Sequence, residues 1–315
     1  MVEIDQEQIT RAVELLTSGE VVAFPTETVY GLGADATNPE ALNKVFSIKG
    51  RPTNHPLIVH IPSAEYLRLW VREVPESAEK LAEKFWPGAL TIILARNGRV
   101  ADEAVGSKPT IALRVPDHPL ALALLEKFDG GLAGPSANRF GSVSPTSAQH
   151  VLDDLGNEIK LILDGGKCKV GVESTIIDLT GHPEILRPGG IDKSAIEDVL
   201  GEKVLDGSSG ESRAPGMMNS HYAPKANIIL VSAEELQNNP ELNDVGVGVI
   251  SPFAMKANVI WTMPEKADEY ARSLYAVLRE ADLRGIQKLF VVPPEDGSLL
   301  EAVLDRLAKA SAPKN

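Results

Sequence analysis

Polar and cationic side chains recur at the ends of apolar stretches in the first two-thirds of this 315-residue chain. Thr26 follows one such stretch, Arg51 precedes another, and Arg114 ends a third. Ligands of open α/β sheets collect where loops leave strand ends. Lysine and arginine neutralise phosphates and carboxylates, while hydroxyl and amide groups orient them. These residue types at these positions therefore predict a site for an anionic ligand.

Two windows without acidic residues support that prediction. The chain carries 31 basic and 44 acidic residues, a net charge of −13, yet residues 41–64 and 130–152 contain no Asp or Glu. An acidic protein must concentrate positive charge locally to hold an anion. The same net charge argues against a general nucleic-acid surface, which is built from clustered Lys and Arg.

Several common motifs do not explain the chemistry. Residues 31–36 fit the G-x-G-x-x-A dinucleotide fingerprint, but six residues separate them from Phe24 at the end of the preceding strand. No P-loop is found, and the six histidines lack zinc-ligand spacing, so we predict no metal site built from protein ligands. Cys168 stands between two lysines, which would lower its pKa, although a lone cysteine is more often structural.

Strand and helix patterns alternate through most of the chain. In the first part we predict strands over 21–24, 56–61, 90–94, 111–115, 159–163 and 175–179. Helices are predicted over 5–18 with Asp5 as N-cap, after Asn38, after Ser63, over 76–85, from Pro145 with Ser144 as cap, and after Asp192. Residues 26–35 are predicted to form a loop.

A change of composition divides the chain. Residues 206–226 are rich in Gly, Ser and Pro and lack periodicity, which is typical of a linker. Strands over 228–231, 247–250 and 289–292, with helices over 267–284 and 298–310, then predict a second α/β unit. The predicted domains are therefore 1–205 and 227–315, joined by 206–226.

We predict the cellular compartment from features that the sequence lacks. No apolar run reaches the ~18–20 residues of a membrane span, and the acidic N-terminus lacks the features of a signal peptide. Cys168 is the single cysteine and cannot form an internal disulfide. We therefore expect a cytoplasmic protein without membrane contact.

Nine short runs give a more specific indication when taken in order. They are Phe-Pro-Thr-Glu-Thr-Val-Tyr-Gly-Leu-Gly (24–33), Lys-Gly-Arg-Pro (49–52), Pro-Leu-Ile-Val-His (56–60), Trp-Pro-Gly-Ala-Leu-Thr (86–91), Ala-Leu-Arg-Val-Pro (112–116), Gly-Pro-Ser-Ala-Asn (134–138), Asp-Gly-Gly (164–166), Gly-Val-Glu-Ser-Thr-Ile (171–176) and Leu-Arg-Pro-Gly (186–189). This set resembles the YrdC-type L-threonylcarbamoyladenylate synthase family. Ala-Pro-Gly-Met (214–217) and His-Tyr-Ala-Pro (221–224) resemble its longer two-domain form.

The resemblance implies a fold and a reaction. The fold is α/β, a twisted open mixed sheet with a large concave pocket, plus a smaller C-terminal Rossmann-like α/β domain. The reaction is that of a nucleotidyltransferase: ATP, L-threonine and bicarbonate give threonylcarbamoyl-AMP and pyrophosphate, with Mg²⁺ accompanying ATP. The product serves threonylcarbamoyladenosine formation at position 37 of tRNA. A downstream tRNA threonylcarbamoyl transferase is the implied partner, with a weak tRNA contact by the enzyme itself.

The resemblance also assigns residues. Lys49 and Arg51 are the implied catalytic residues and face the phosphates. The other implied ATP-binding residues are Thr53, Thr110, Ser136, Asn138, Ser144, Arg187 and Tyr222. The implied threonine-binding residues are Thr26, His60, Arg114 and Ser174, with Arg114 pairing bidentately with the carboxylate. The 206–226 linker is expected to cover the pocket, although Met218-Asn219 stands where the family usually has Lys-Tyr.

Two alternatives stay open. An RNA-binding module would use the same basic concave surface, but the charge of −13 counts against it. A carbamoyl-transfer domain of the hydrogenase-maturation type would share the fold, but these 315 residues contain no acylphosphatase or zinc-finger segment beside it.

Overall fold

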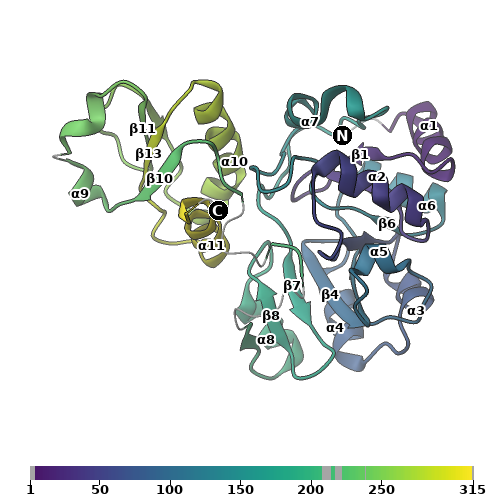
Figure 1. The fold of residues 1–315 in the computed structure, drawn as a ribbon. Helices are drawn as coiled ribbons and strands as arrows, with labels where there is room; N and C mark the ends of the chain where they lie inside the picture. Colours follow the sequence, from purple (N-terminus) through teal and green to yellow (C-terminus); the bar gives the residue numbers. More distant parts are fainter. Residues whose placement is uncertain (1–3, 208–213, 217–221, 238, 314–315) are drawn as a thin grey trace.

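Two β-sheets organise the chain (Figure 1). The computed structural model describes residues 4–207, 214–216, 222–237 and 239–313. The larger sheet is mixed, and its nine strands run in the order β1 (Val22–Phe24), β2 (Gly31–Asp35), β6 (Leu132–Ala133), β3 (Ile58–His60), β5 (Thr110–Arg114), β4 (Leu90–Ala95), β7 (Thr175–Asp178), β8 (Glu184–Arg187) and β9 (Leu205–Asp206). The predicted twisted mixed sheet is confirmed.

Helices cover one face of the large sheet. Their apolar residues share one core with the inward residues of the strands. These helices are α2 (Pro39–Lys49), α3 (Leu67–Trp70), α4 (Glu76–Phe85), α5 (Asp102–Val105), α7 (Ala148–Leu155) and α8 (Lys193–Leu200), with 3₁₀ turns at Ala64–Tyr66 and Gly156–Glu158. A second core near β1 is closed by α1 (Gln6–Thr17) and α6 (Pro119–Phe128).

The opposite face of the central strands carries the polar residues. Side chains alternate between the two faces of a strand. In β3, Val59 belongs to the helix-covered core, so His60 points the other way. In β5, Leu113 belongs to that core, so Arg114 also points the other way. His60 and Arg114 are register partners in the parallel β3–β5 pair, and the sheet therefore sets them side by side.

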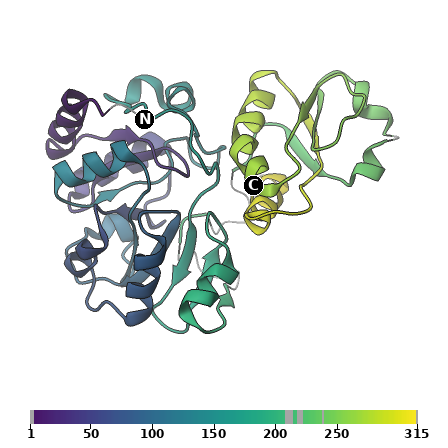
Figure 2. The ribbon, with the colours of Figure 1, turned by 180° about the vertical axis from the view of Figure 1, so that it is seen from behind.

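The smaller sheet is entirely parallel. Its strand order is β10 (Asn227–Leu230), β13 (Lys288–Val291), β11 (Val247–Ser251) and β12 (Ile260–Thr262), accompanied by α9 (Ala233–Gln237), a 3₁₀ turn at Pro240–Asn243, α10 (Ala267–Leu283) and α11 (Leu300–Ser311). Both ribbon views place α10 and α11 on the side that faces the larger domain (Figures 1 and 2). Val29 and Val172 of the larger domain share one apolar core with these helices. Among the described helices, none has the length and apolar character of a membrane span.

Most predicted elements are present. Asp5 accepts hydrogen bonds from the backbone N–H groups of Glu7 and Gln8, and Asn38 caps α2 in the same way. The predicted loop over 26–35 is wrong at its end, because residues 31–35 form β2 and pair antiparallel with β1. A Cβ at Gly31 or Gly33 would lie 2.9 Å from the Phe24 ring, so glycine, usually poor in strands, is what this strand requires.

Two other predictions are corrected. The strand predicted over 159–163 is reduced to one isolated bridge between Ile162 and Ala23. The helix predicted from Pro145 begins at Ala148, and its cap is Ser147, which accepts from the N–H of His150. Ser144 was the expected cap, but its hydroxyl donates to the Glu173 carboxylate at 2.6 Å. Met218-Asn219 lies outside the described residues.

Gly189 gives a test of how β7 and β8 pack at the edge of the polar face. A Cβ there would lie 2.3 Å from the backbone at Ser174 and Thr175, which cannot move aside cheaply. We expect Gly189→Ala to lower the free energy of unfolding by about 1–3 kcal/mol in denaturant titrations. Gly181→Ala is the control, because nothing lies within 4 Å of its added methyl group. Equal stability of the two variants would contradict this packing.

Candidate active site

A cavity that is partly open to solvent lies on the polar face of the large sheet. Its walls come from the loop after β1, from β3, β5 and β8, and from the segments around residues 134–136 and 215–216. Eight of the predicted site residues line it: Thr26, Arg51, His60, Arg114, Ser136, Ser174, Arg187 and Tyr222. Residues spread over about 200 positions of sequence thus meet in one place.

Arg114 is held by a buried acid. Its Nη2 lies 2.7 Å from Oε1 of Glu27, and its Nε donates to the carbonyl oxygen of Gly88 at 3.1 Å. Oε2 of Glu27 accepts from the N–H of Asp117 at 3.0 Å. Within the described residues, Nη1 of Arg114 has no hydrogen-bond partner. The end of the guanidinium is therefore oriented and open to a carboxylate.

His60 is a neutral imidazole beside that guanidinium. Its side chain is buried, and its ring packs edge-on against Phe24 with 5.4 Å between the ring centroids. Burial, and then the positive charge of Arg114, lower the pKa of His60 to about 3. Nδ1 has no hydrogen-bond partner among the residues that the structure describes. The ring thus lines the cavity without adding charge to it.

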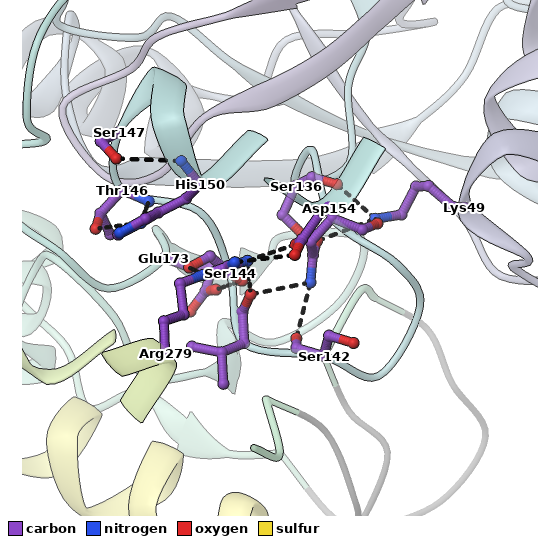
Figure 3. A network of polar contacts seen from close by, with 12 residues as sticks. Lys49, Ser136, Ser142, Ser144, Thr146, Ser147, His150, Asp154, Glu173 and Arg279 are labelled. Carbon is purple, nitrogen blue, oxygen red and sulfur yellow. Dashed lines mark hydrogen bonds and ion pairs between the residues drawn. The ribbon is translucent and has the colours of Figure 1, made fainter. Parts of the chain in front are cut away.

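Arg51 and Lys49 leave the end of α2 in different directions. Arg51 lines the cavity, with Nη2 donating to the carbonyl of Pro56 at 3.1 Å. Its Nε lacks a partner in the described chain, and burial lowers its pKa to about 10. Lys49 instead points under the loop at 134–138, where Nζ donates to the carbonyl oxygens of Ser136 and Asn138 and to the side-chain oxygen of Asn138 (Figure 3).

That loop is fixed from several sides. The Ser136 hydroxyl donates to Oδ1 of Asn138 at 2.6 Å, and Nδ2 of Asn138 donates to the carbonyl of Ser142 at 2.8 Å. Burial, reinforced by Arg51, lowers the pKa of Lys49 well below its usual value. Lys49 is thus a support for the cavity wall in this structure, and its place beside the phosphates stays a prediction.

Arg187 joins two walls of the cavity. Its Nε and Nη2 donate to the carbonyl oxygen of Ser174 at 3.1 and 2.9 Å, and Nη2 also lies 3.1 Å from the Ser174 hydroxyl. Nη1 donates to the carbonyl of Pro215 at 3.1 Å. The Ser174 hydroxyl is 2.8 Å from that of Thr91. Arg187 therefore places Ser174 and ties the described part of the predicted linker to the sheet.

Glu173 is a buried carboxylate in the same wall. Oε1 accepts from the Ser144 hydroxyl at 2.6 Å, and Oε2 accepts from the Tyr275 hydroxyl at 2.8 Å and from Nε of Arg306 at 2.7 Å. Arg306 and Arg187 outweigh the effect of burial and lower the pKa of Glu173 to about 2. Figure 3 shows Glu173 next to Ser144, with Arg279 reaching the same loop.

Comparisons with known proteins identify the family of this chain. Residues 14–189 match the Sua5/YciO/YrdC family model, described as telomere recombination, and residues 191–312 match a model described as threonylcarbamoyl-AMP synthase, C-terminal domain. The chain belongs to this family, in its two-domain Sua5 form. It is similar to the threonylcarbamoyl-AMP synthases of Pyrococcus abyssi (42% identity, covering 98% of this chain and 95% of that protein) and Bacillus subtilis (40%, covering 96% and 93%).

A solved structure of the same family has the same architecture. The crystal structure of P. abyssi Sua5 complexed with L-threonine is 40% identical in sequence, with a TM-score of 0.92, and the match covers 98% of this chain and 95% of that one. The predicted α/β fold, a twisted mixed sheet with a second, smaller α/β domain, is thus confirmed for a Sua5 family member.

Not every predicted residue of this Sua5 family member reaches the cavity. Thr53 is exposed, and Thr110 stands at the start of β5 on the face of Arg114; neither is among the lining residues. Asn138 and Ser144 lie behind the wall and act on lining residues through hydrogen bonds. Burial raises the pKa of Cys168 to about 12, so the lowering expected from its lysine neighbours is wrong.

Two buried acids lie within the motifs, but the sequence alone predicts no role for them. Glu27 holds Arg114, and Glu173 holds Ser144 and Arg306. Both sit beside predicted threonine-binding residues, Thr26 and Ser174. An acid next to a predicted anion site was the available signal, because such an acid needs a cationic partner.

The pKa of His60 predicts a pH-dependent stability. The folded imidazole stays neutral until about pH 3, whereas the unfolded one takes up a proton near pH 6.5, so stability falls as pH drops through that interval. Between pH 7.5 and 5, we expect wild type to lose about 2 kcal/mol more than His60→Gln in urea titrations. His182→Gln, at an exposed histidine, is the control. Equal losses in wild type and His60→Gln would contradict a neutral buried His60.

The position of Lys49 predicts a combined effect on stability and binding. Lys49→Met removes the donor from three buried oxygens, so we expect about 2–4 kcal/mol less stability together with weaker ATP binding. Lys44→Met, at a more exposed lysine of the same helix, is the control for both the free energy of unfolding and the affinity for ATP. A fully stable Lys49→Met that has lost ATP binding would instead indicate direct contact with the nucleotide.

Proposed function

We propose that this protein is an L-threonylcarbamoyladenylate synthase, which converts ATP, L-threonine and bicarbonate into threonylcarbamoyl-AMP and pyrophosphate. The observation that carries the proposal is one cavity in which Arg51, Arg114 and Arg187 surround a neutral His60. Relatives named threonylcarbamoyl-AMP synthase that match over nearly the whole chain support it. The product would pass to a tRNA threonylcarbamoyl transferase, with at most a weak tRNA contact here.

The proposed reaction has two bond-forming steps. The threonine amine attacks the carbon of bicarbonate and gives a carbamate with loss of water. A carbamate oxygen then attacks the α-phosphorus of ATP, and pyrophosphate leaves. Carboxylate, carbamate and triphosphate would repel one another strongly in a shared cavity without cations. The arginines address this problem by electrostatics and positioning, with no covalent enzyme intermediate.

The threonine side lies around Arg114. Its free end is suited to pair with the amino-acid carboxylate through Nη1 and the outer proton of Nη2, since Nε and Glu27 fix its other edge. His60 lines the cavity beside Arg114, which suits it to contact the amino-acid substrate. The P. abyssi Sua5 structure, which contains L-threonine, supports threonine as the amino acid.

The nucleotide side lies around Arg51. Arg51 lines the cavity and has no carboxylate partner among the described residues, and its guanidinium suits phosphate oxygens. Ser136 and the Lys49-supported loop are the proposed wall for nucleotide oxygens. Mg²⁺ would enter with ATP, and because Glu27 and Glu173 are both committed to arginines, phosphate oxygens and water would be its ligands.

The test is pyrophosphate release with ATP and Mg²⁺, omitting L-threonine or bicarbonate in turn. We expect release only when both are present, and about a hundredfold lower kcat/KM for ATP in Arg51→Met. Release without threonine would contradict the proposal and indicate another acceptor. Salt-sensitive tRNA binding without release would favour the RNA-binding module. Turnover of carbamoyl phosphate would favour carbamoyl transfer.

Arg68→Met provides the control, because Arg68 is exposed and distant from the cavity-lining residues, so its loss should leave release unchanged. A decrease as large as that of Arg51→Met would show that the assay responds to general loss of positive charge and would contradict a specific role for Arg51.

A further inference from the structure

Glu173 places a carboxylate in the wall of a cavity that is proposed to accept anions. Its side chain is buried and lines the cavity next to Ser174 and Arg187. Without a counterion, this charge would repel a triphosphate and an amino-acid carboxylate across a poorly screened space. A neutralising partner is therefore needed for the site to work.

The counterion comes from the C-terminal domain. Arg306 belongs to α11, its side chain is 1% exposed, and its Nε lies 2.7 Å from Oε2 of Glu173. Its Nη2 donates to the carbonyl of Pro188 at 3.0 Å, and its guanidinium lies 5.0 Å from the centre of the Tyr222 ring. Tyr275 of α10 donates to the same carboxylate oxygen. These are the two helices that face the larger domain in Figures 1 and 2.

The charges around the cavity show what the Glu173–Arg306 ion pair contributes to the binding of anions. Among the described residues around the cavity, Arg114 is offset by Glu27 and Glu173 is offset by Arg306, so Arg51 and Arg187 are the lining arginines that no described carboxylate offsets. Asp305 and Lys309 also lie beside Arg306 and offset each other at 2.9 Å. Removing the charge of Arg306 would therefore halve the positive charge available to the ligands.

We infer that Arg306 is a positioning residue of the nucleotide site: by neutralising Glu173, the C-terminal domain completes the electrostatics of a cavity that lies in the other domain. Arg306 is not among the lining residues and acts through Glu173, which in turn holds the Ser144 hydroxyl. The inference rests on the proposed function for the identity of the anion, ATP.

The test is a double-mutant cycle that neutralises each charge of the pair. ATP binding is measured by calorimetry, with MgATP as the probe and the full chain throughout. We expect Arg306→Met to raise the Kd about tenfold or more. Glu173→Gln alone should bind ATP at least as tightly as wild type, because it adds one net positive charge. The double variant Glu173→Gln/Arg306→Met should return to within about threefold of wild type, since a buried pair replaced by neutral groups is tolerated.

Two further variants separate charge from packing. Arg306→Lys keeps the positive charge but not the planar guanidinium group, so we expect this variant to bind ATP more tightly than Arg306→Met. Arg272→Met removes a more exposed arginine from α10 and should leave the Kd unchanged. If Arg306→Met fails to fold, the lysine variant and the double variant still decide the outcome.

A double variant that binds no better than Arg306→Met would overturn the inference, because the loss would then be one of structure and not of charge. A folded Arg306→Met with the Kd of wild type would overturn it as well. Normal ATP binding by wild type without threonine-dependent pyrophosphate release would overturn the proposed function alone, and the charge cycle would still be decided.

Discussion

Burial of arginine is the constraint on which the cavity depends. A guanidinium withdrawn from water is costly unless oxygen atoms receive its protons. Here four arginines are at most 8% exposed, namely Arg51, Arg114, Arg187 and Arg306. Each is met by a backbone carbonyl, and two of them also by a carboxylate. The acceptors come from distant parts of the chain, so the need to satisfy these cations also brings the walls together.

This arrangement reconciles an acidic protein with anionic substrates. The positive charge is concentrated inside the concave face, where it acts through little water, while the surplus of acidic residues contributes only weakly through solvent. Two of the internal cations are then balanced by internal acids, which fixes their orientation. The remaining two, Arg51 and Arg187, contribute the net positive charge of the described lining residues. Arginines of similar burial thus differ in whether a carboxylate of the protein balances them.

Local signals were sufficient for much of the fold and for part of the site. The cap at Asp5 and the helix start after Asn38 are predicted by the sequence, because they depend on the next few residues alone. Seen in the structure, the alternation of side chains in β3 and β5 places His60 and Arg114 on one face, which agrees with the pairing that the motifs implied. By contrast, β2 was missed because its glycines are explained only by the Phe24 ring of the neighbouring strand.

Local sequence patterns could not show which residues support the cavity wall without lining the cavity. Lys49 and Arg51 are two positions apart in one motif, yet one supports a loop and the other lines the cavity, and this depends on the tertiary position of residues 134–138. The sequence predicts Ser144 as a helix cap because Pro145 follows it, but in the structure its hydroxyl donates to the buried carboxylate of Glu173. Long-range partners of this kind leave no period or spacing in the sequence.

The Glu173–Arg306 contact joins residues 133 positions apart, and its second member stands nine residues before the end of the chain. Domains fold during synthesis from the N-terminus onward. A first domain that folds before α11 is made would therefore hold Glu173 without its counterion. The charge balance of the cavity thus depends on a helix that is made well after the strands that carry the site, and a chain without α11 lacks the counterion of Glu173.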